Sequence, residues 1–501
     1  MELAAFILYF VAMLFIGLFF FFKSKNNSGE KEYFLGGRSM GPWVTAMSAQ
    51  ASDMSGWLLM GLPGSILAFG LGQAWIGIGL AIGTAANWIL VAKRLRRFSK
   101  AANDSITLPQ YLSNRFATKN HALQIICAVI FLVFFTVYVA SSFVAGATVF
   151  STVIPGLSED VALIIFALVL LTYTFLGGYK AVCWTDFFQG ILMLVALLSV
   201  PIMVVITQNL DSSALNEVYT YVENEEKTVY AFNSNLFSAD WREIVTGLAW
   251  GLGYFGMPHI LVRFMSIKKS SMVKKSATVA IIWVVLSLVA TILLAVFGRM
   301  MIGEELLTAG AQKLVFIRLA RMLFPAFVAG LLMAAIIAAA MSTADSQLLV
   351  ASSSFTSDIY KPIFRKNASD KELLWVGRIT VLAVAVVAYF IASSKGKGAQ
   401  AIMDMVTNAW AGFGAAFGPV VTLSLFWKRM TYKGAVAGVV AGAAVDVAWM
   451  LFLSSSTRIY ELLPGFAAGL IACVVVTLID KEPSKEVTDI FDTAMDMSID
   501  E

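Results

Sequence analysis

Long apolar runs recur along this chain and constrain its fold more than any other feature. Of its 501 residues, 59% are hydrophobic and only 14% are charged. A helix that crosses a bilayer needs about twenty apolar residues, and the runs have that length. We therefore predict an all-α integral membrane protein with about thirteen transmembrane helices, over residues 3–22, 43–66, 71–91, 122–149, 161–176, 186–206, 241–264, 277–297, 325–350, 374–392, 401–427, 434–453 and 462–479.

Basic residues predict which loops face the cytoplasm. Lys and Arg gather in residues 93–97, 268–275, 361–371 and 428–433, and cytoplasmic loops carry such an excess. The loop over residues 207–240 is acidic, which fits the outer face. The resulting topology for a cell-membrane protein has the N-terminus outside, a retained first span and the C-terminus inside. We also expect a short external helix pair within residues 304–323 and a solvated acidic tail from Asp480.

The predicted span over residues 43–66 is unusually polar. It holds Asp53 between hydroxyl residues, then Gly56, and later the sequence Leu62-Pro63-Gly64. A charge at membrane depth costs roughly 2.5–3.5 kcal/mol on insertion scales, so it faces protein or water and marks a functional pathway. Unwound backbone is tolerated there only where it lines a buried cavity. The stretch predicts a broken helix that binds an ion and a solute.

A second interrupted span lies five spans later, over residues 241–264, where Trp250-Gly251-Leu252-Gly253-Tyr254-Phe255-Gly256 precedes Pro258. Glycine in one span can serve helix packing alone. Two interrupted spans at matching positions, running in opposite directions, instead indicate an inverted-repeat transporter. We predict four parts: a peripheral first helix and loop (1–40), a first repeat with an external loop (41–240), a second repeat (241–430), and peripheral spans with a cytoplasmic tail (431–501).

The sequence shows no pattern that is typical of an enzyme. Its three cysteines and two histidines lack metal-ligand spacing, and it contains no nucleophile elbow, zinc-protease motif or phosphate loop. An ion channel or a uniporter is the alternative to a coupled transporter. A continuous polar pore lining would favour that alternative. We predict a carrier that needs neither nucleic acid nor an obligate protein partner.

Five motifs resemble those of the sodium/solute symporter family: Ala51-Ser52-Asp53-Met54-Ser55-Gly56-Trp57, Thr174-Phe175-Leu176-Gly177-Gly178-Tyr179-Lys180-Ala181-Val182, Gly251-Leu252-Gly253-Tyr254-Phe255-Gly256, Met341-Ser342-Thr343-Ala344-Asp345-Ser346-Gln347-Leu348-Leu349 and Trp427-Lys428-Arg429-Met430-Thr431-Tyr432-Lys433-Gly434-Ala435. The resemblance covers nearly the whole chain and is strongest to the family's proline carriers, with Met257 where a glutamine is expected. It implies the five-plus-five inverted-repeat fold of the leucine transporter. It also implies Na+-coupled import of L-proline by alternating access; pantothenate, a sugar or a carboxylate is the alternative solute.

The resemblance also assigns a sodium site. Its ligands would be the carbonyls of Ala51, Met54 and Ala339 and the hydroxyls of Ser342 and Thr343. Transporters bind Na+ through such unwound carbonyls and hydroxyls. Ala339 and Ser342 share a helix face at i, i+3. Hydroxyls in a membrane helix also bond back to the preceding turn, which is the alternative for this pair.

Two carboxylates are candidates for sodium coupling. Asp53 would raise sodium affinity by its charge and couple it to the solute; the alternative is a structural partner for a basic residue or for free N–H groups. Asp186 resembles a second carboxylate near the family's sodium route, whereas its predicted interfacial position equally fits a solvated role. Arg38 resembles an arginine of the inner gate, and a positive-inside anchor is its alternative.

The predicted solute site has a polar and an aromatic part. Ser55, Gly56 and Trp57 can offer N–H groups to a carboxylate where a half-helix begins. Aromatic walls suit a compact ring that bears a cation, and the resemblance assigns this role to Tyr138, Trp250, Tyr254 and Pro258. Plain helix packing is the alternative for such a stripe. A sugar carrier would place more Asn, Gln, Glu and Lys at this depth.

Overall fold

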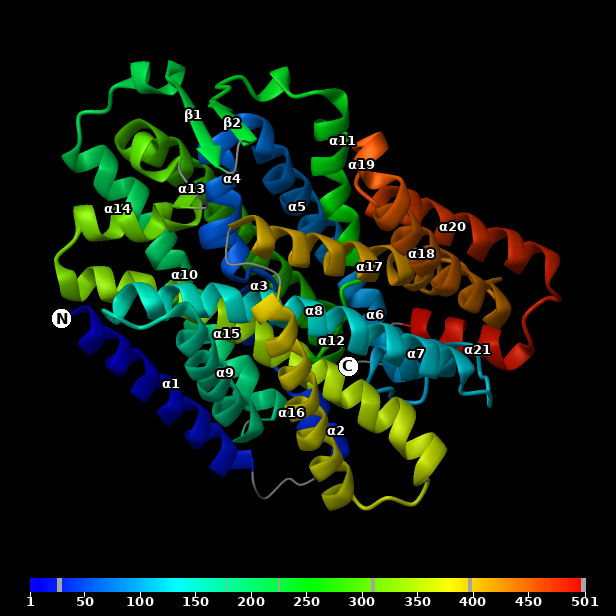
Figure 1. The fold of residues 1–501 in the computed structure, drawn as a ribbon. Helices are drawn as coiled ribbons and strands as arrows, with labels where there is room; N and C mark the ends of the chain where they lie inside the picture. The colour runs from blue at the N-terminus through cyan, green and yellow to red at the C-terminus, as the bar shows by residue number, and fades with distance from the viewer. Residues whose placement is uncertain (25–28, 177, 224–225, 308–310, 395–398, 497–501) are drawn as a thin grey trace.

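The computed structural model describes residues 1–24, 29–176, 178–223, 226–307, 311–394 and 399–496, which are mostly helical (Figure 1). In this part of the chain, ten helices are long and apolar enough to cross a membrane, or eleven if the bent pair Trp241–Phe255 and Pro258–Ser266 forms one span. The predicted count of about thirteen is therefore not confirmed. The polar span at 43–66 drops out because its break leaves two short pieces, Pro42–Asp53 and Trp57–Phe69. The predicted fifth span, the eighteen-residue α9, is also outside this set.

The elements of the first half are α1 (Glu2–Ser24), α2 (Glu30–Leu35), η1 (Gly36–Arg38), α3 (Pro42–Asp53), η2 (Trp57–Gly61), α4 (Leu62–Phe69), η3 (Leu71–Gln73), α5 (Ala74–Ala86), η4 (Asn87–Val91), α6 (Ala92–Ala101), α7 (Leu108–Arg115), α8 (Ala122–Val153), α9 (Glu159–Leu176), α10 (Tyr179–Thr207) and η5 (Ser212–Asn216). The loop after α10 then forms an antiparallel hairpin of β1 (Val218–Glu223) and β2 (Glu226–Ala231). The sequence pattern did not predict this hairpin.

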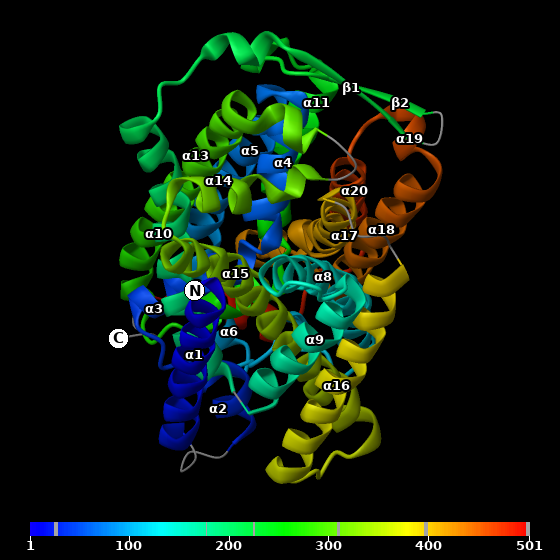
Figure 2. The ribbon, with the colours of Figure 1, turned by 60° about the vertical axis from the view of Figure 1, so that its left-hand side comes forward.

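The second half continues with η6 (Leu236–Ser238), α11 (Trp241–Ala249), η7 (Trp250–Phe255), α12 (Pro258–Ser266), η8 (Ser270–Met272), α13 (Val273–Leu306), η9 (Ala311–Leu314), α14 (Val315–Leu323), α15 (Ala326–Ser353), η10 (Ser354–Phe364), α16 (Asp370–Ser394), α17 (Ala399–Phe426), α18 (Tyr432–Phe452), α19 (Ser454–Thr457), α20 (Leu462–Ile479) and α21 (Lys485–Met495). Of the short helix pair expected within 304–323, the structure shows the 3-10 turn η9 and the helix α14, whereas residues 304–306 are the end of α13. Figures 1 and 2 show α1 on one side of the bundle and α18 and α20 on the opposite side.

Both broken helices form where the sequence predicts them, and they run antiparallel. α3 ends at Asp53, and a π-helical turn, η2, leads into α4. The second break is the 3-10 turn η7, followed by a bend of 43° into α12. Met40, just before α3, pairs with Ile267, just after α12, while Gly70, just after α4, pairs with Asn233 ahead of α11. The start of one broken helix therefore lies beside the end of the other at both ends.

Two glycine pairs bring α5 and the second broken helix into backbone contact. A Cβ on Gly83 would lie 2.3 Å from the carbonyl oxygen of Gly251, and one on Gly79 would lie 2.2 Å from that of Gly247. Along each helix the two glycines are spaced i, i+4, as Gly79 and Gly83 or as Gly247 and Gly251. Small residues at this spacing let membrane helices approach closely. Main-chain packing against α5 therefore helps to hold the broken helix in place.

We expect Gly83→Val to destabilise the protein by about 1–3 kcal/mol, because the added atoms meet backbone that cannot move aside. The measurement is the free energy of unfolding in mixed micelles. Gly77→Ala is the matched control on the same helix, since its nearest neighbours would lie at an ordinary 3.7 Å. Equal stability of the two variants would show that α5 and η7 tolerate wider spacing.

Helix α15 lies inside the bundle and carries three of the five predicted sodium ligands, Ala339, Ser342 and Thr343. Most of its residues are buried, and it contacts α1, α3, α8 and α10. The run of alanines from Ala338 to Ala340 is fully buried, and small side chains permit close approach of neighbouring helices. This packing places Ser342 against the break after α3.

The tail after α20 is not wholly solvated, contrary to our expectation. α21 buries Val487, Phe491 and Ala494, which lie at i, i+4 and i+7 on one face. The ring of Phe491 meets that of Phe98 in α6 edge-on, with centroids 5.1 Å apart. The acidic composition obscured this amphipathic spacing.

Candidate functional site

Three of the five predicted sodium ligands meet around one hydroxyl. The Ser342 Oγ donates to the carbonyl oxygen of Ala51 at 2.7 Å and approaches that of Ala339 at 3.2 Å. Ala51 belongs to the last turn of α3, which ends at Asp53, whereas Ser342 and Ala339 belong to α15. The back-bond within α15 and the contact across to α3 therefore coexist. A cation at this position would be coordinated by the carbonyl oxygens that now accept the hydrogen of the Ser342 hydroxyl.

The other two predicted ligands are buried in the same segments. Thr343 is fully buried, and its Oγ1 has no hydrogen-bond partner among the described residues. Met54 caps α3 with non-helical backbone angles, φ −85° and ψ 79°. Its carbonyl therefore lies outside the regular helical ladder, as an ion ligand from a broken helix requires.

Asp53 connects the predicted ion side to the predicted solute side. Its Oδ2 accepts a hydrogen bond of 2.5 Å from the Tyr254 hydroxyl in η7, so the two breaks touch. Its other oxygen, Oδ1, has no partner among the described residues. Tyr254 was predicted only as part of the solute wall. The described residues give Asp53 no ion pair with a basic residue, the structural alternative considered for it.

Aromatic side chains from both breaks form a common wall. The rings of Trp57 and Trp250 lie with their centroids 6.4 Å apart, and the Trp57 Nε1 approaches the carbonyl of Asp53 at 3.4 Å. Tyr138 reaches the first break from α8, and its buried hydroxyl lies near Ser55 and Trp57 without a satisfactory hydrogen bond. The structure thus brings together aromatic residues from α8 and both broken helices.

Two members of this wall were missed by the sequence analysis. Trp410 of α17 donates to the carbonyl of Trp250 at 2.8 Å and meets the Tyr254 ring edge-on at 5.0 Å. Tyr460, just before α20, stacks on Trp250 with centroids 5.4 Å apart. No local pattern marks either residue. Gly253 offered an indirect signal, because a Cβ there would lie 2.0 Å from the Trp410 Nε1.

The remaining predicted solute residues lie at the breaks. Ser55 is buried and its Oγ has no partner among the described residues. Gly56 permits close packing against α8, since a Cβ would lie 2.5 Å from that of Ala145. Pro258 is the first residue of α12, where its fixed φ suits a helix start. Pro258 begins the helix beyond the second break, whereas Ser55 lies within the first.

Asp186 is fully buried inside the protein, so the solvated alternative for it is wrong. Its Oδ2 lies 3.1 Å from an Nη of the equally buried Arg263. Ser48 of α3 donates to the same oxygen at 2.7 Å, and Ser346 of α15 lies at 3.4 Å. Arg263 also bonds Ser346 and the carbonyl of His259. One ion pair therefore joins α3, α10, α12 and α15. The sequence analysis did not assign Arg263 a role.

Arg38 lies where the two broken helices meet. Its guanidinium donates to the Met265 carbonyl near the end of α12, to Ser99 in α6 and to the Ser105 carbonyl. It also pairs with Asp104 at 2.8 Å. This network gives Arg38 a set of specific partners across three segments, more than a loop anchor requires.

The Arg38–Asp104 pair is ionised at neutral pH. Burial raises the pKa of Asp104, but the hydrogen bonds and charges of Lys31 and Arg38 outweigh it, so the net pKa lies below the usual range. A carboxylate whose pKa is lowered by folding stabilises the folded state at every pH above its pKa in the unfolded chain. This stabilisation is lost as the pH falls through its pKa in the folded protein. The pair therefore persists at neutral pH.

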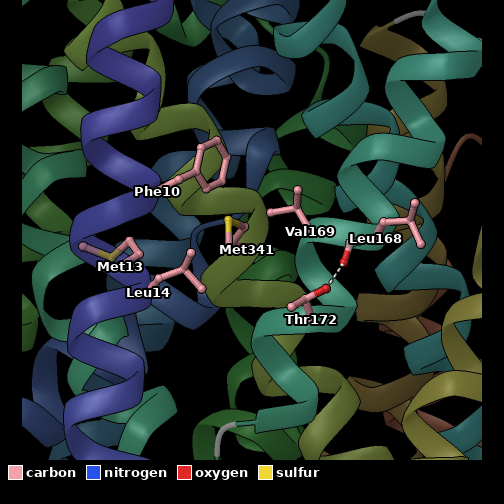
Figure 3. A pocket seen from close by; sticks show the side chains of 7 residues that line it. All are labelled: Phe10, Met13, Leu14, Leu168, Val169, Thr172 and Met341. Atoms are coloured by element: carbon pink, nitrogen blue, oxygen red, sulfur yellow. Dashed lines mark hydrogen bonds between the residues drawn. The ribbon is translucent and has the colours of Figure 1, made fainter.

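A cavity of about 270 Å³ near α15 is unsuited to a charged solute. It lies between α1, α9 and α15. The side chain of Met341, the residue before Ser342, points into it (Figure 3). Its lining is apolar except for Thr172, whose hydroxyl already bonds the Leu168 carbonyl at 2.8 Å. A zwitterion would lose its hydration there without replacement partners.

Two antiparallel broken helices, with hydroxyls and an aromatic wall at their breaks, define a membrane carrier. The chain belongs to the sodium:solute symporter family, whose model matches residues 33–442. It is 44% identical over 97% of its length to the high-affinity proline transporter PutP of Bacillus subtilis (strain 168), covering 99% of that protein. It is 43% identical over 96% to the sodium/proline symporter of Escherichia coli (strain K12), covering 94% of that protein.

Solved structures confirm the predicted leucine-transporter-like fold. A Na+-coupled sialic acid symporter in a substrate-bound outward-open state matches 96% of this chain and 98% of its own, with a TM-score of 0.74 at 19% identity. Mhp1, a nucleobase-cation-symport-1 family transporter, matches 92% of this chain and 98% of its own, with a TM-score of 0.54 at 13% identity. At these identities the likeness concerns the fold alone.

Proposed function

We propose that this protein is a sodium-coupled symporter that imports L-proline across the cytoplasmic membrane. The observation that carries the proposal is the contact of Ser342 on α15 with the Ala51 carbonyl at the first break, 2.7 Å long. Two residues further on, Asp53 bonds Tyr254 of the second break. An ion at the first contact would therefore influence a solute held between the two breaks. Relatives named as proline transporters or sodium/proline symporters align along nearly the whole chain.

The proposed sodium ligands are the carbonyls of Ala51, Met54 and Ala339 and the hydroxyls of Ser342 and Thr343. This set consists of neutral oxygens, which suit a hard monovalent cation. Asp53 supplies a nearby negative charge without needing to touch the ion. Asp186 would act differently, since its ion pair with Arg263 connects α10 and α12 to Ser346 of α15.

The proposed proline site lies between the two breaks. Ser55, Gly56 and Trp57 would direct N–H groups toward the carboxylate. Tyr138, Trp250, Tyr254 and Pro258 would surround the ring and its ammonium group, where aromatic faces attract a cation. Trp410 and Tyr460 both pack against Trp250.

Transport would proceed by alternating access, with the repeats 41–240 and 241–430 rocking around the site. External sodium would bind first, hold α3 against α15 and complete the proline site. Arg38 would serve as an inner gate that must release the end of α12 before sodium and proline leave. One charge moving inward gains about 2.3 kcal/mol per 100 mV, and a tenfold sodium gradient adds about 1.4 kcal/mol.

We also propose an external N-terminus and a cytoplasmic C-terminus. The basic segments 93–97, 268–275 and 428–433 then share the cytoplasmic side, as the positive-inside rule requires. Labelling of single cysteines placed near residues 2 and 482 with an impermeant reagent on intact cells tests this orientation. Labelling at 482 alone would reverse it.

Uptake of labelled proline into proteoliposomes tests the function. We expect accumulation only with an inward sodium gradient, enhanced by an inside-negative potential. Competition with unlabelled proline, pantothenate, a sugar and a carboxylate defines the solute, and only proline is expected to abolish uptake. Sodium-independent uptake would refute the coupling, whereas failure of proline to compete would refute the solute.

A further inference from the structure

Asp345 is a buried carboxylate that the proposed mechanism does not use. It lies on α15 and is fully buried. Neither of its oxygens has a hydrogen-bond partner among the described residues. The adjacent Ser346 hydroxyl lies 3.4 Å from Asp186, and Ser346 also interacts electrostatically with Asp345. A buried charge is normally paired or coordinates a cation, so Asp345 requires an explanation.

The neighbouring charges do not neutralise Asp345. Asp186 and Arg263 interact electrostatically with it, but they already form an ion pair with each other. Two carboxylates facing one guanidinium leave one negative charge in excess when all three are ionised. The geometry assigns the excess to Asp345, because Arg263 donates to Asp186 and Ser346.

Asp345 lies one helical turn from the proposed sodium ligands. It follows Ser342 at i, i+3, so the two side chains project from the same face of α15, with Cβ atoms about 5–6 Å apart. In a buried site of low dielectric constant, charges at such a separation interact much more strongly than in water. A monovalent cation at Ser342 would therefore be attracted by the unpaired carboxylate.

We propose that Asp345 of α15 sets the sodium affinity of the site electrostatically. It would act on the ion through space, from one helical turn beyond Ser342 along α15. This inference rests on the proposed sodium site. It gives Asp345 a positioning role distinct from that of Asp186, whose charge Arg263 compensates. Sodium bound beside Ser342 would supply the positive charge that the ionised Asp345 side chain lacks among its neighbours.

Sodium binding to purified, full-length protein without proline tests the inference, with the fluorescence of the tryptophans near the site, Trp57 and Trp250, as readout. Asp345→Asn is expected to raise the sodium concentration for half-saturation about tenfold, equivalent to about 1.4 kcal/mol. Asp345→Glu is expected to restore most of the affinity because it keeps the charge. Asp446→Asn is the matched control: Asp446 is also buried in a membrane helix, and its Oδ1 also has no partner among the described residues. It should leave the sodium dependence unchanged.

Ser342→Ala in the same assay separates the two proposals. If Ser342→Ala weakens sodium binding but Asp345→Asn behaves like Asp446→Asn, the role of Asp345 is refuted and the sodium site stands. If Ser342→Ala leaves binding unchanged, the sodium site itself is refuted, and the inference with it. Should Asp345→Asn fail to fold, Asp345→Ser applies the same test, and a half-saturation equal to that of the unmodified protein would again refute the role.

Discussion

Replacing Arg263 by glutamine is expected to destabilise the protein by about 3–5 kcal/mol, because it leaves the buried carboxylate of Asp186 without its partner. The side chains of this pair are 1% and 0% exposed, so water cannot compensate. Four helices lose their common contact, and proline uptake should fall below detection. The measurements are the free energy of unfolding in mixed micelles and uptake in proteoliposomes.

The double variant Asp186→Asn/Arg263→Gln should recover most of the lost stability, because no buried charge of the pair remains uncompensated. Arg318→Gln is the matched control, since Arg318 pairs with Glu305 while both are about half exposed. Such surface pairs contribute only about 0–1 kcal/mol. If Arg263→Gln were as mild as Arg318→Gln, the pair would not join the helices as described.

The second large effect is expected for Asp53→Asn, which should raise the sodium concentration for half-maximal proline uptake at least about tenfold. The variant removes a negative charge beside the proposed ion site while preserving the side chain's size. It also weakens the bond with the Tyr254 hydroxyl, so the apparent affinity for proline should fall as well. Unchanged sodium dependence would remove Asp53 from the sodium site.

Tyr254→Phe separates the two roles of Asp53. It deletes the 2.5 Å hydrogen bond but keeps the carboxylate charge. We therefore expect it to weaken proline binding more than sodium binding. Sodium dependence that shifts as much as in Asp53→Asn would mean that the bond, rather than the charge, determines ion affinity.

The sequence predicted the broken helices well because their signals are local. Glycine, proline and a carboxylate within an apolar run indicate unwound backbone wherever the run lies in the fold, and the breaks at Asp53 and Trp250 are where these signals place them. The count of spans was less predictable, because the polar break divides one run into pieces too short to qualify alone.

The partners of the site residues were harder to predict because they come from distant segments. Asp53 and Tyr254 are 201 residues apart, and Asp186 and Arg263 are 77 apart. Charge and apolar periodicity do not report such pairings. Trp410 illustrates the same difficulty, since its place beside Trp250 depends on how α17 packs against η7.

The sequence by itself determined that this chain crosses a membrane, where its helices break and which family it resembles, since apolar length, glycine and proline act through local physics. Only the tertiary structure decided which charges are compensated. It places Arg263 on Asp186, Tyr254 on Asp53, and no hydrogen-bond donor among the described residues on Asp345. The reason is electrostatic: the free energy of a buried charge depends on its nearest neighbours in space, and these come from helices that the linear sequence does not order.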